Sequence, residues 1–188
     1  AILRLTSQQI VEISKLPGVE YIEMPKRFYF QLYESLYASC ITLVQQPPRN
    51  LSGRGVIIGI ADTSLDVFHP DFLDDNGQTR VLDLWDQTIP GNPPDGYKVG
   101  SIFSREQINN VLAESDPLSR RMLFPSIDLS GHGTAVAGIA AGNGKASSGR
   151  QRGAAYESEL IIVKLGNSET GGFPRTTELM QAVNFMVQ

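Results

Sequence analysis

The sequence has 188 residues, and its hydrophobic content of 41% and charged content of 19% are ordinary for a globular protein with one substantial core and a small appendage. The formal net charge of −4 at pH 7 argues weakly against nucleic acid as a partner. No apolar run approaches the roughly 20 residues that a membrane-spanning helix needs. Cys40 is the only cysteine, so a disulfide within these residues is excluded.

The first segment, residues 1–27, has a strand, helix, strand pattern. Residues 1–5 are apolar and suited to a strand, and because they read as a strand entered midway, we expect the native N-terminus to lie upstream. Thr6 and Gln9 have the spacing of a capping box, and apolar residues follow at helical spacing up to a Pro-Gly pair. Residues 19–23 alternate as a half-buried strand.

A connector, residues 28–52, separates this segment from the rest of the chain. It is rich in Phe, Tyr and Leu, which fit packing better than a ligand-binding role. It ends in the turn-rich sequence PPRNLSG, which predicts a boundary. We therefore expect the main domain to span residues 53–188.

The main domain opens on the apolar run GVIIGIAD, residues 55–62. Such a continuous run predicts a central parallel strand that is covered on both faces, and the run LIIVKL at residues 160–165 predicts a second one. Asp62 would stand at the carboxyl end of the first strand. Open α/β sheets place their functional sites at that edge.

A second informative segment is SGHGTAVAGIAAG, residues 130–142. Its small apolar residues lie on every face, which predicts a buried helix, with Ser130 and Gly131 able to cap its start and Gly142 its end. His132 would lie in the first turn, with its ring at the mouth of the helix. The segment alone fits a structural histidine as well as a functional one.

The two segments together favour a functional role. An aspartate at a strand end and a histidine at a helix start can meet through Nδ1, which fixes the tautomer of the ring and stabilises the imidazolium. Asp62 and His132 would then supply two of the three members of a Ser-His-Asp triad.

Three motifs carry a family resemblance: IADTSLD at residues 60–66, HPDF at 69–72 and GHGTAVAG at 131–138. They resemble the aspartate and histidine signatures of the subtilisin-like serine proteases. The resemblance implies a serine endopeptidase with an α/β fold and a doubly wound, mostly parallel sheet. It also implies the triad order Asp, His, Ser, in which Asp62 orients His132 and His132 acts as the general base.

The sequence departs from the family pattern at two positions. Ser64 stands where the family usually has glycine, and Ala135 stands where a second histidine is common. If the backbone at Ser64 needs a positive φ, its side chain costs about 1 to 2 kcal/mol. Ala135 leaves the triad untouched, because that second histidine is not one of its members.

The resemblance also assigns roles to the other segments. Residues 1–27 resemble the second half of a propeptide, which chaperones folding and inhibits the enzyme; the alternative is a small α+β piece of the main domain. Maturation would cut within residues 28–52. Residues 53–188 would be the N-terminal half of a catalytic domain that acts on peptide or protein substrates.

The spacing from Asp62 to His132 exceeds that of a minimal subtilisin, and we expect the excess at residues 77–124. An insertion of this kind with the sequence WDQT resembles the subtilases of clostridial and related bacteria, including spore-germination proteases, and implies a secreted, cell-surface or spore-associated protein. It would be a surface subdomain that covers one edge of the sheet, or would shape substrate access. Ser104 and Gln107 predict a capped helix within it.

A substrate-binding segment is implied after the strand at residues 160–165. In the family, the backbone there receives the substrate as an added strand, and Gly166, Gly171 and Gly172 would permit the close approach. A flexible loop accounts for these glycines equally well.

Metal binding has little support in the sequence. His69 and His132 are the only histidines, and neither an His-x-x-x-His motif nor a cysteine cluster accompanies them. Family members often use the aspartate of His-Pro-Asp, here Asp71, as a calcium ligand. The companion loop at residues 143–152 has three cations and no carboxylate, which is a poor calcium site. We expect no required cofactor and leave calcium near Asp71 as the alternative.

The nucleophile is not apparent in these residues. No serine stands in a Gly-Thr-Ser-Met-Ala-like segment, and Ser130 is too close to His132 in sequence for a productive approach. We expect the serine in a C-terminal half of the domain that lies outside these 188 residues. The alternative is a non-catalytic relative that binds a protein or small ligand through the same cleft.

Overall fold

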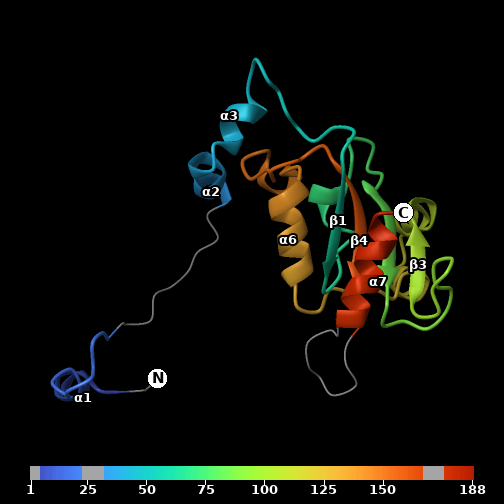
Figure 1. Cartoon of the computed structure of the whole chain (residues 1–188). Helices are drawn as coiled ribbons and strands as arrows, with labels where there is room; N and C mark the ends of the chain where they lie inside the picture. The colour runs from blue at the N-terminus through green and yellow to red at the C-terminus, as the bar shows by residue number, and fades with distance from the viewer. Residues whose placement is uncertain (1–4, 23–31, 167–175) are drawn as a thin grey trace. The chain divides into compact units, whose positions relative to one another are not determined.

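The computed structural model describes residues 5–22, 32–166 and 176–188 (Figure 1). The chain divides into two compact units, Ala1–Phe30 and Gln31–Gln188. Each unit is described by itself.

The first unit contains helix α1, Ser7–Ile13. The predicted capping box is confirmed, because the Thr6 side chain accepts from the Gln9 amide and the Gln9 side chain accepts from the Thr6 amide. The predicted strand at residues 19–23 is wrong over residues 19–22, which have no regular structure, and Tyr21 is 74% exposed. An alternating segment needs a partner strand, and residues 5–22 contain none.

The second unit is built on a four-stranded sheet with the order β1-β4-β2-β3. The strands are β1 (Ile57–Asp62), β2 (Val81–Asp86), β3 (Ser101–Ser104) and β4 (Glu159–Lys164). β4 pairs in parallel with both β1 and β2, whereas β3 pairs antiparallel with β2. The sheet is therefore mixed and mostly parallel.

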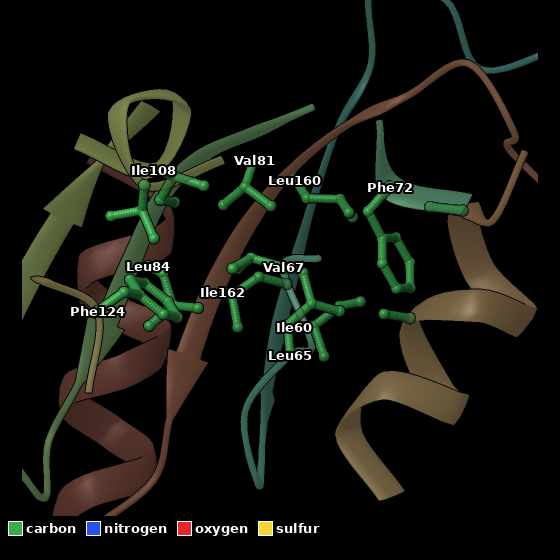
Figure 2. Packing of buried hydrophobic residues seen from close by; sticks show 13 residues of the cluster. Ile60, Leu65, Val67, Phe72, Val81, Leu84, Ile108, Phe124, Leu160 and Ile162 are labelled. Carbon is green, nitrogen blue, oxygen red and sulfur yellow. The ribbon is translucent and has the colours of Figure 1, made fainter. Parts of the chain in front are cut away.

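Helices cover both faces of this sheet. Helix α6, His132–Ala141, packs with one set of strand residues, and helix α7, Thr176–Met186, packs with the alternate set. Successive strand residues point to opposite faces. The α6 face includes Ile60, Leu84 and Ile162 (Figure 2), and the α7 face includes Ala61, Trp85 and Val163. The arrangement confirms the predicted α/β class and is consistent with part of a subtilisin fold.

The small residues of α6 allow its first turn to lie directly on the loop after β1. A Cβ added to Gly133 would stand 2.1 Å from the backbone oxygen of Ser64, so any larger residue would push the helix away. Gly131 is the N-cap of the helix and Gly142 its C-cap, and the Ser130 hydroxyl accepts from the His132 amide. The predicted caps of this helix are confirmed.

Two expectations about strand position are corrected. β1 was expected in the centre of the sheet, but within the sheet formed by the described residues it is an edge strand, and Ile57 is 52% exposed. β2 comes from residues 77–124, which we expected to cover one edge, yet it lies between β4 and β3 with Leu84 and Trp85 fully buried. Apolar runs indicate covered faces but not the order of strands.

The remaining helices are α2 (Leu32–Ala38), α3 (Ile41–Gln45), α4 (Arg105–Ala113) and α5 (Pro117–Leu123), with 3-10 turns at Pro70–Phe72 and Lys145–Ser147. The capping box predicted for Ser104 and Gln107 is confirmed at the start of α4. Gln45 ties α3 to the domain by donating to the carbonyls of Gly153 and Ala154. Among the described residues, no helix is long and apolar enough to cross a membrane.

Candidate active site

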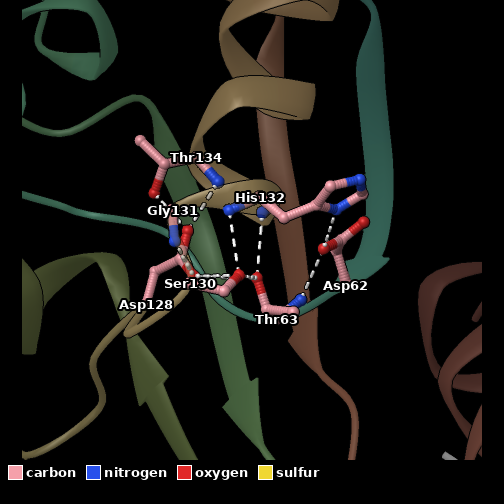
Figure 3. Close-up of polar contacts among 8 residues, drawn as sticks. Asp62, Thr63, Asp128, Ser130, Gly131, His132 and Thr134 are labelled. Atoms are coloured by element: carbon pink, nitrogen blue, oxygen red, sulfur yellow. Dashed lines mark hydrogen bonds and ion pairs between the residues drawn. The ribbon is translucent and has the colours of Figure 1, made fainter. Parts of the chain in front are cut away.

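Asp62 and His132 meet at the carboxyl end of β1. The carboxylate oxygen Oδ1 of Asp62 lies 2.7 Å from Nδ1 of His132, which confirms the predicted contact (Figure 3). The other ring nitrogen of His132 points away from Asp62. The side chain of His132 is 68% exposed and that of Asp62 is 17% exposed. A reactant could therefore approach His132 at Nε2 while Asp62 holds the opposite side of the ring.

The environment of His132 favours its protonated form. The hydrogen bond to Asp62 raises the pKa of His132 above its ordinary value of 6.5. The charges of Asp62 and Asp128 act in the same direction, and desolvation acts against them. The contact at Nδ1 favours the neutral tautomer with its proton on Nδ1. Nε2 is then the proton acceptor of the neutral ring, as a general base requires.

A second carboxylate, Asp128, organises the loop before α6, and our sequence analysis did not identify it. Its Oδ2 accepts from the amide and hydroxyl of Thr134 at 2.8 and 2.7 Å. Its Oδ1 accepts from the Gly131 amide at 3.0 Å and from the Thr63 hydroxyl at 2.8 Å. Burial opposes ionisation of Asp128, but these hydrogen bonds outweigh it and hold the pKa of the carboxyl below its ordinary value. A carboxylate shortly before a predicted helix start was the available signal.

Thr63 connects Asp128 to the Asp62 and His132 pair. Its amide donates to Asp62 Oδ1 at 2.7 Å, and its hydroxyl accepts from the Gly133 amide at 2.9 Å (Figure 3). The end of β1 and the first turn of α6 are therefore joined by the Thr63 hydroxyl as well as by the Asp62 to His132 contact.

Ser64 has the positive φ that the family's glycine would accommodate, at 125°. Its side chain is buried, and its hydroxyl lies 3.1 Å from that of Ser126. Ser126 in turn donates to the buried carboxylate of Asp86 at 2.6 Å, and Lys164 Nζ lies 3.3 Å from the same oxygen. The serine is thus partnered, which offsets part of the cost of its backbone conformation.

A cavity of about 830 Å³ opens beside His132, at the ends of β1 and β4. Asp62, His132 and Lys164 line it, with apolar walls from Ile127, Leu129 and Leu165. Its volume lies within the usual range of ligand-binding pockets.

The residues expected to bind substrate are only partly described. Gly166 is buried after β4, and its amide donates to the Gln87 side chain at 2.9 Å, so that amide is already engaged. Gly171 and Gly172 lie outside the described residues. His69 does not join the site, because its Nδ1 accepts from the Asp71 amide at 3.3 Å.

Comparison with known proteins settles the family. Residues 53–186 match the subtilase family, peptidase S8. The chain belongs to the subtilase family. Its structure resembles the CspB protease of Clostridium perfringens with a TM-score of 0.68 and 34% sequence identity, over 81% of this chain and 29% of that one.

A plant subtilase is also similar. The chain is 28% identical over 184 residues to subtilisin-like protease SBT2.4 of Arabidopsis thaliana, which covers 86% of this chain and 22% of that protein. The chain thus spans less than a third of the length of either relative.

Proposed function

We propose that this subtilase is a serine endopeptidase in which Asp62 orients His132 and His132 acts as the general base. The observation that carries the proposal is the 2.7 Å contact between Asp62 Oδ1 and His132 Nδ1, with Nε2 left open. Family membership supports the same chemistry. The attacking serine is assigned to a part of the protein outside these 188 residues.

The reaction follows from the roles of the two groups. His132 Nε2 takes the proton of the serine hydroxyl as its oxygen bonds to the peptide carbonyl carbon. The imidazolium, stabilised by Asp62, then gives this proton to the leaving amine as the C–N bond breaks. Water, deprotonated by the same ring, hydrolyses the acyl-enzyme and restores the serine.

The substrate is proposed to be an extended peptide whose side chains enter the cavity beside His132. Its backbone would add as a strand along the segment after β4, where we placed Gly166, Gly171 and Gly172. The Gly166 amide already donates to Gln87, so that amide is not available to pair with the peptide.

The roles of the other segments are part of the same proposal. Residues 1–27 would belong to a propeptide, and residues 28–52 would contain the site of maturation. A secreted, cell-surface or spore-associated location also stays a prediction.

The proposal is tested with the full-length protein and a fluorophosphonate probe that acylates activated serines. We expect labelling of the wild type and peptide turnover, and a loss of kcat of about 10⁴-fold in Asp62→Asn, because the wrong histidine tautomer is then favoured. Asp66→Asn is the matched control, since Asp66 lies on the same loop but binds the Phe68 amide instead of His132. A wild type that binds peptides yet shows neither labelling nor turnover would favour the non-catalytic alternative.

A further inference from the structure

Arg80 is a buried cation at the junction of three segments of the main domain. The residue is only 9% exposed. The guanidinium donates to the carbonyl of Ser158 at 2.7 Å, to that of Asp71 at 2.6 Å and to that of Ala141 at 2.5 Å. Arg80, the residue before β2, is thus hydrogen-bonded to the turn after β1, to the last residue of α6 and to the residue before β4.

The charge of Arg80 suits this junction. Ala141 ends α6, so its carbonyl carries the negative end of the helix dipole, which a cation stabilises. Desolvation lowers the pKa of Arg80, and the nearby charge of Asp71 acts in the opposite direction. The Nε of Arg80 has no hydrogen-bond partner among the described residues, so the guanidinium is held by its two terminal nitrogens.

Asp71 accepts hydrogen bonds from protein N–H groups through both its side chain and its carbonyl. Its carboxylate oxygen Oδ1 accepts from the Ala146 amide at 2.7 Å. Its carbonyl accepts from the Asn143 amide at 3.0 Å as well as from Arg80. A second cation, Lys145, lies in the loop after α6. It contacts the carbonyl of Asp74 and lies 3.3 Å from the carboxylate of Asp75.

These contacts test whether the residues fit the calcium ion that the family resemblance implied for Asp71. Calcium takes six to eight oxygen ligands at about 2.3 to 2.6 Å. Here the carbonyl oxygen and Oδ1 of Asp71 accept from N–H donors, and the Arg80 guanidinium is one of them. A second cation, Lys145, lies in the loop after α6 that a calcium ion would share. The described residues contain no cluster of three or more His, Cys, Asp or Glu side chains that could hold a metal. The residues do not fit the ion.

We propose that the buried Arg80 and the surface residue Lys145 together take over the joining role of a calcium ion at Asp71, so that folding of this domain is independent of calcium. Arg80 supplies the buried charge, and Lys145 ties the loop after α6 to the Asp74 and Asp75 turn. The proposal concerns the fold and holds whether or not the protein is a peptidase.

The first test uses the wild-type full-length protein, dialysed against a calcium chelator or supplied with millimolar calcium chloride. Hydrogen exchange is followed for peptides that cover residues 141–156, because the Ala146 amide reports directly on Asp71. We expect equal protection in both conditions. Faster exchange of these residues in the chelator, reversed by calcium, would overturn the proposal.

The second test removes the internal cation. Arg80→Met should lower the Tm by about 5 °C or more, since three backbone carbonyls lose their buried donor. Arg121→Met is the matched control, because Arg121 is exposed in α5. The Tm of the Arg121→Met protein should stay within about 1 °C of that of the wild type. An Arg80→Met protein as stable as this control would overturn the proposal.

If Arg80→Met fails to fold, Lys145→Met provides the milder variant. In this variant, the backbone amides of residues 141–156 should exchange hydrogen faster than in the wild type. Their exchange rate should be the same in chelator and in calcium. Unchanged exchange in Lys145→Met would contradict the role of Lys145, and protection by calcium in that variant would show that the site retains a metal.

Discussion

The Thr63 hydroxyl donates to Asp128 Oδ1 across 2.8 Å, and the Thr63 amide donates to Asp62 Oδ1 across 2.7 Å. One residue thus joins the carboxylate that contacts His132 to the carboxylate that anchors the first turn of α6. The orientation of His132 depends on both carboxylates, although only Asp62 contacts its ring.

Asp128 is expected to position the catalytic pair without touching substrate. Asp128→Ala leaves the amides of Gly131 and Thr134 without their acceptor, so the first turn of α6 should loosen. We expect kcat/KM of the full-length protein to fall about 10- to 100-fold. This magnitude is taken by analogy from groups that orient the ligands of a metal ion. Steady-state peptide hydrolysis measures this loss.

Asp116→Ala is the matched control for that variant. Asp116 is also an acceptor at a helix start, where it binds the amide and hydroxyl of Ser119 at 2.8 and 2.7 Å. Its removal should lower stability slightly, because the start of α5 loses its cap, and leave kcat/KM unchanged. Equal activity of Asp128→Ala and Asp116→Ala would refute the positioning role of Asp128.

The pH dependence of hydrolysis should report the raised pKa of His132. A general base must be neutral, and a raised pKa keeps the ring protonated to higher pH. Activity should therefore rise with pH along a limb whose midpoint lies above 6.5, the ordinary value for histidine. The midpoint can be read from the pH profile of kcat/KM and from NMR titration of the His132 ring.

Asp62→Asn removes the main cause of that shift. The NMR midpoint of His132 should then move to lower pH, because neither the hydrogen bond to a carboxylate nor its charge remains to favour the imidazolium. An unchanged midpoint in Asp62→Asn would show that the two side chains do not interact in solution.

Ser64 should reverse the usual order of glycine and alanine. Because its φ is 125°, Ser64→Ala keeps the backbone strain and loses the contact with Ser126, whereas Ser64→Gly relieves the strain. We expect the glycine variant to be more stable than the alanine variant by about 1 to 2 kcal/mol in denaturant unfolding.

The same pair of substitutions at Ser119 supplies the comparison. Ser119 lies within helix α5, where alanine should be more stable than glycine by up to about 1 kcal/mol. If alanine were more stable than glycine at Ser64, as it should be at Ser119, then Ser64 would not have a strained backbone conformation.

The candidate site was predictable where its signals are local in sequence. The apolar run before Asp62 predicted a buried strand, and the small residues after His132 predicted a buried helix. Asp62 at the end of the strand and His132 at the start of the helix were therefore expected to meet. The caps at Thr6 and Ser104 were equally local. The family signatures then supplied the roles that the residues alone left open.

Features that depend on distant residues could not be predicted in this way. Arg80 carries no local signal, and the position of Asp128 before a helix start does not specify its partners. Their roles arise from carbonyl and amide groups that only the fold brings together. The strand at residues 19–23 was predicted from its alternation, which cannot show whether a partner strand exists. Apolar runs likewise predicted β1 and β4 but not that β4 would lie between β1 and β2.

The final prediction concerns the exposed edge of β1 in a protein made of these 188 residues alone. β4 has a strand on each side, but β1 has one neighbour in the described sheet, and its unpaired edge can add a strand from another copy. We expect such a protein to self-associate, and Ile57→Lys should reduce this association because a charged residue on an edge strand opposes pairing.

Met122→Lys is the matched control, since Met122 is 71% exposed in α5, away from the sheet edge. Light scattering over a concentration series should show less association for Ile57→Lys than for Met122→Lys and the wild type. None of the three should hydrolyse peptides, because the proposed nucleophilic serine belongs to a part of the protein outside these residues. A monomeric wild type at every concentration would rule out the edge as an association site, and multiple turnovers by these residues alone would require a nucleophile among them.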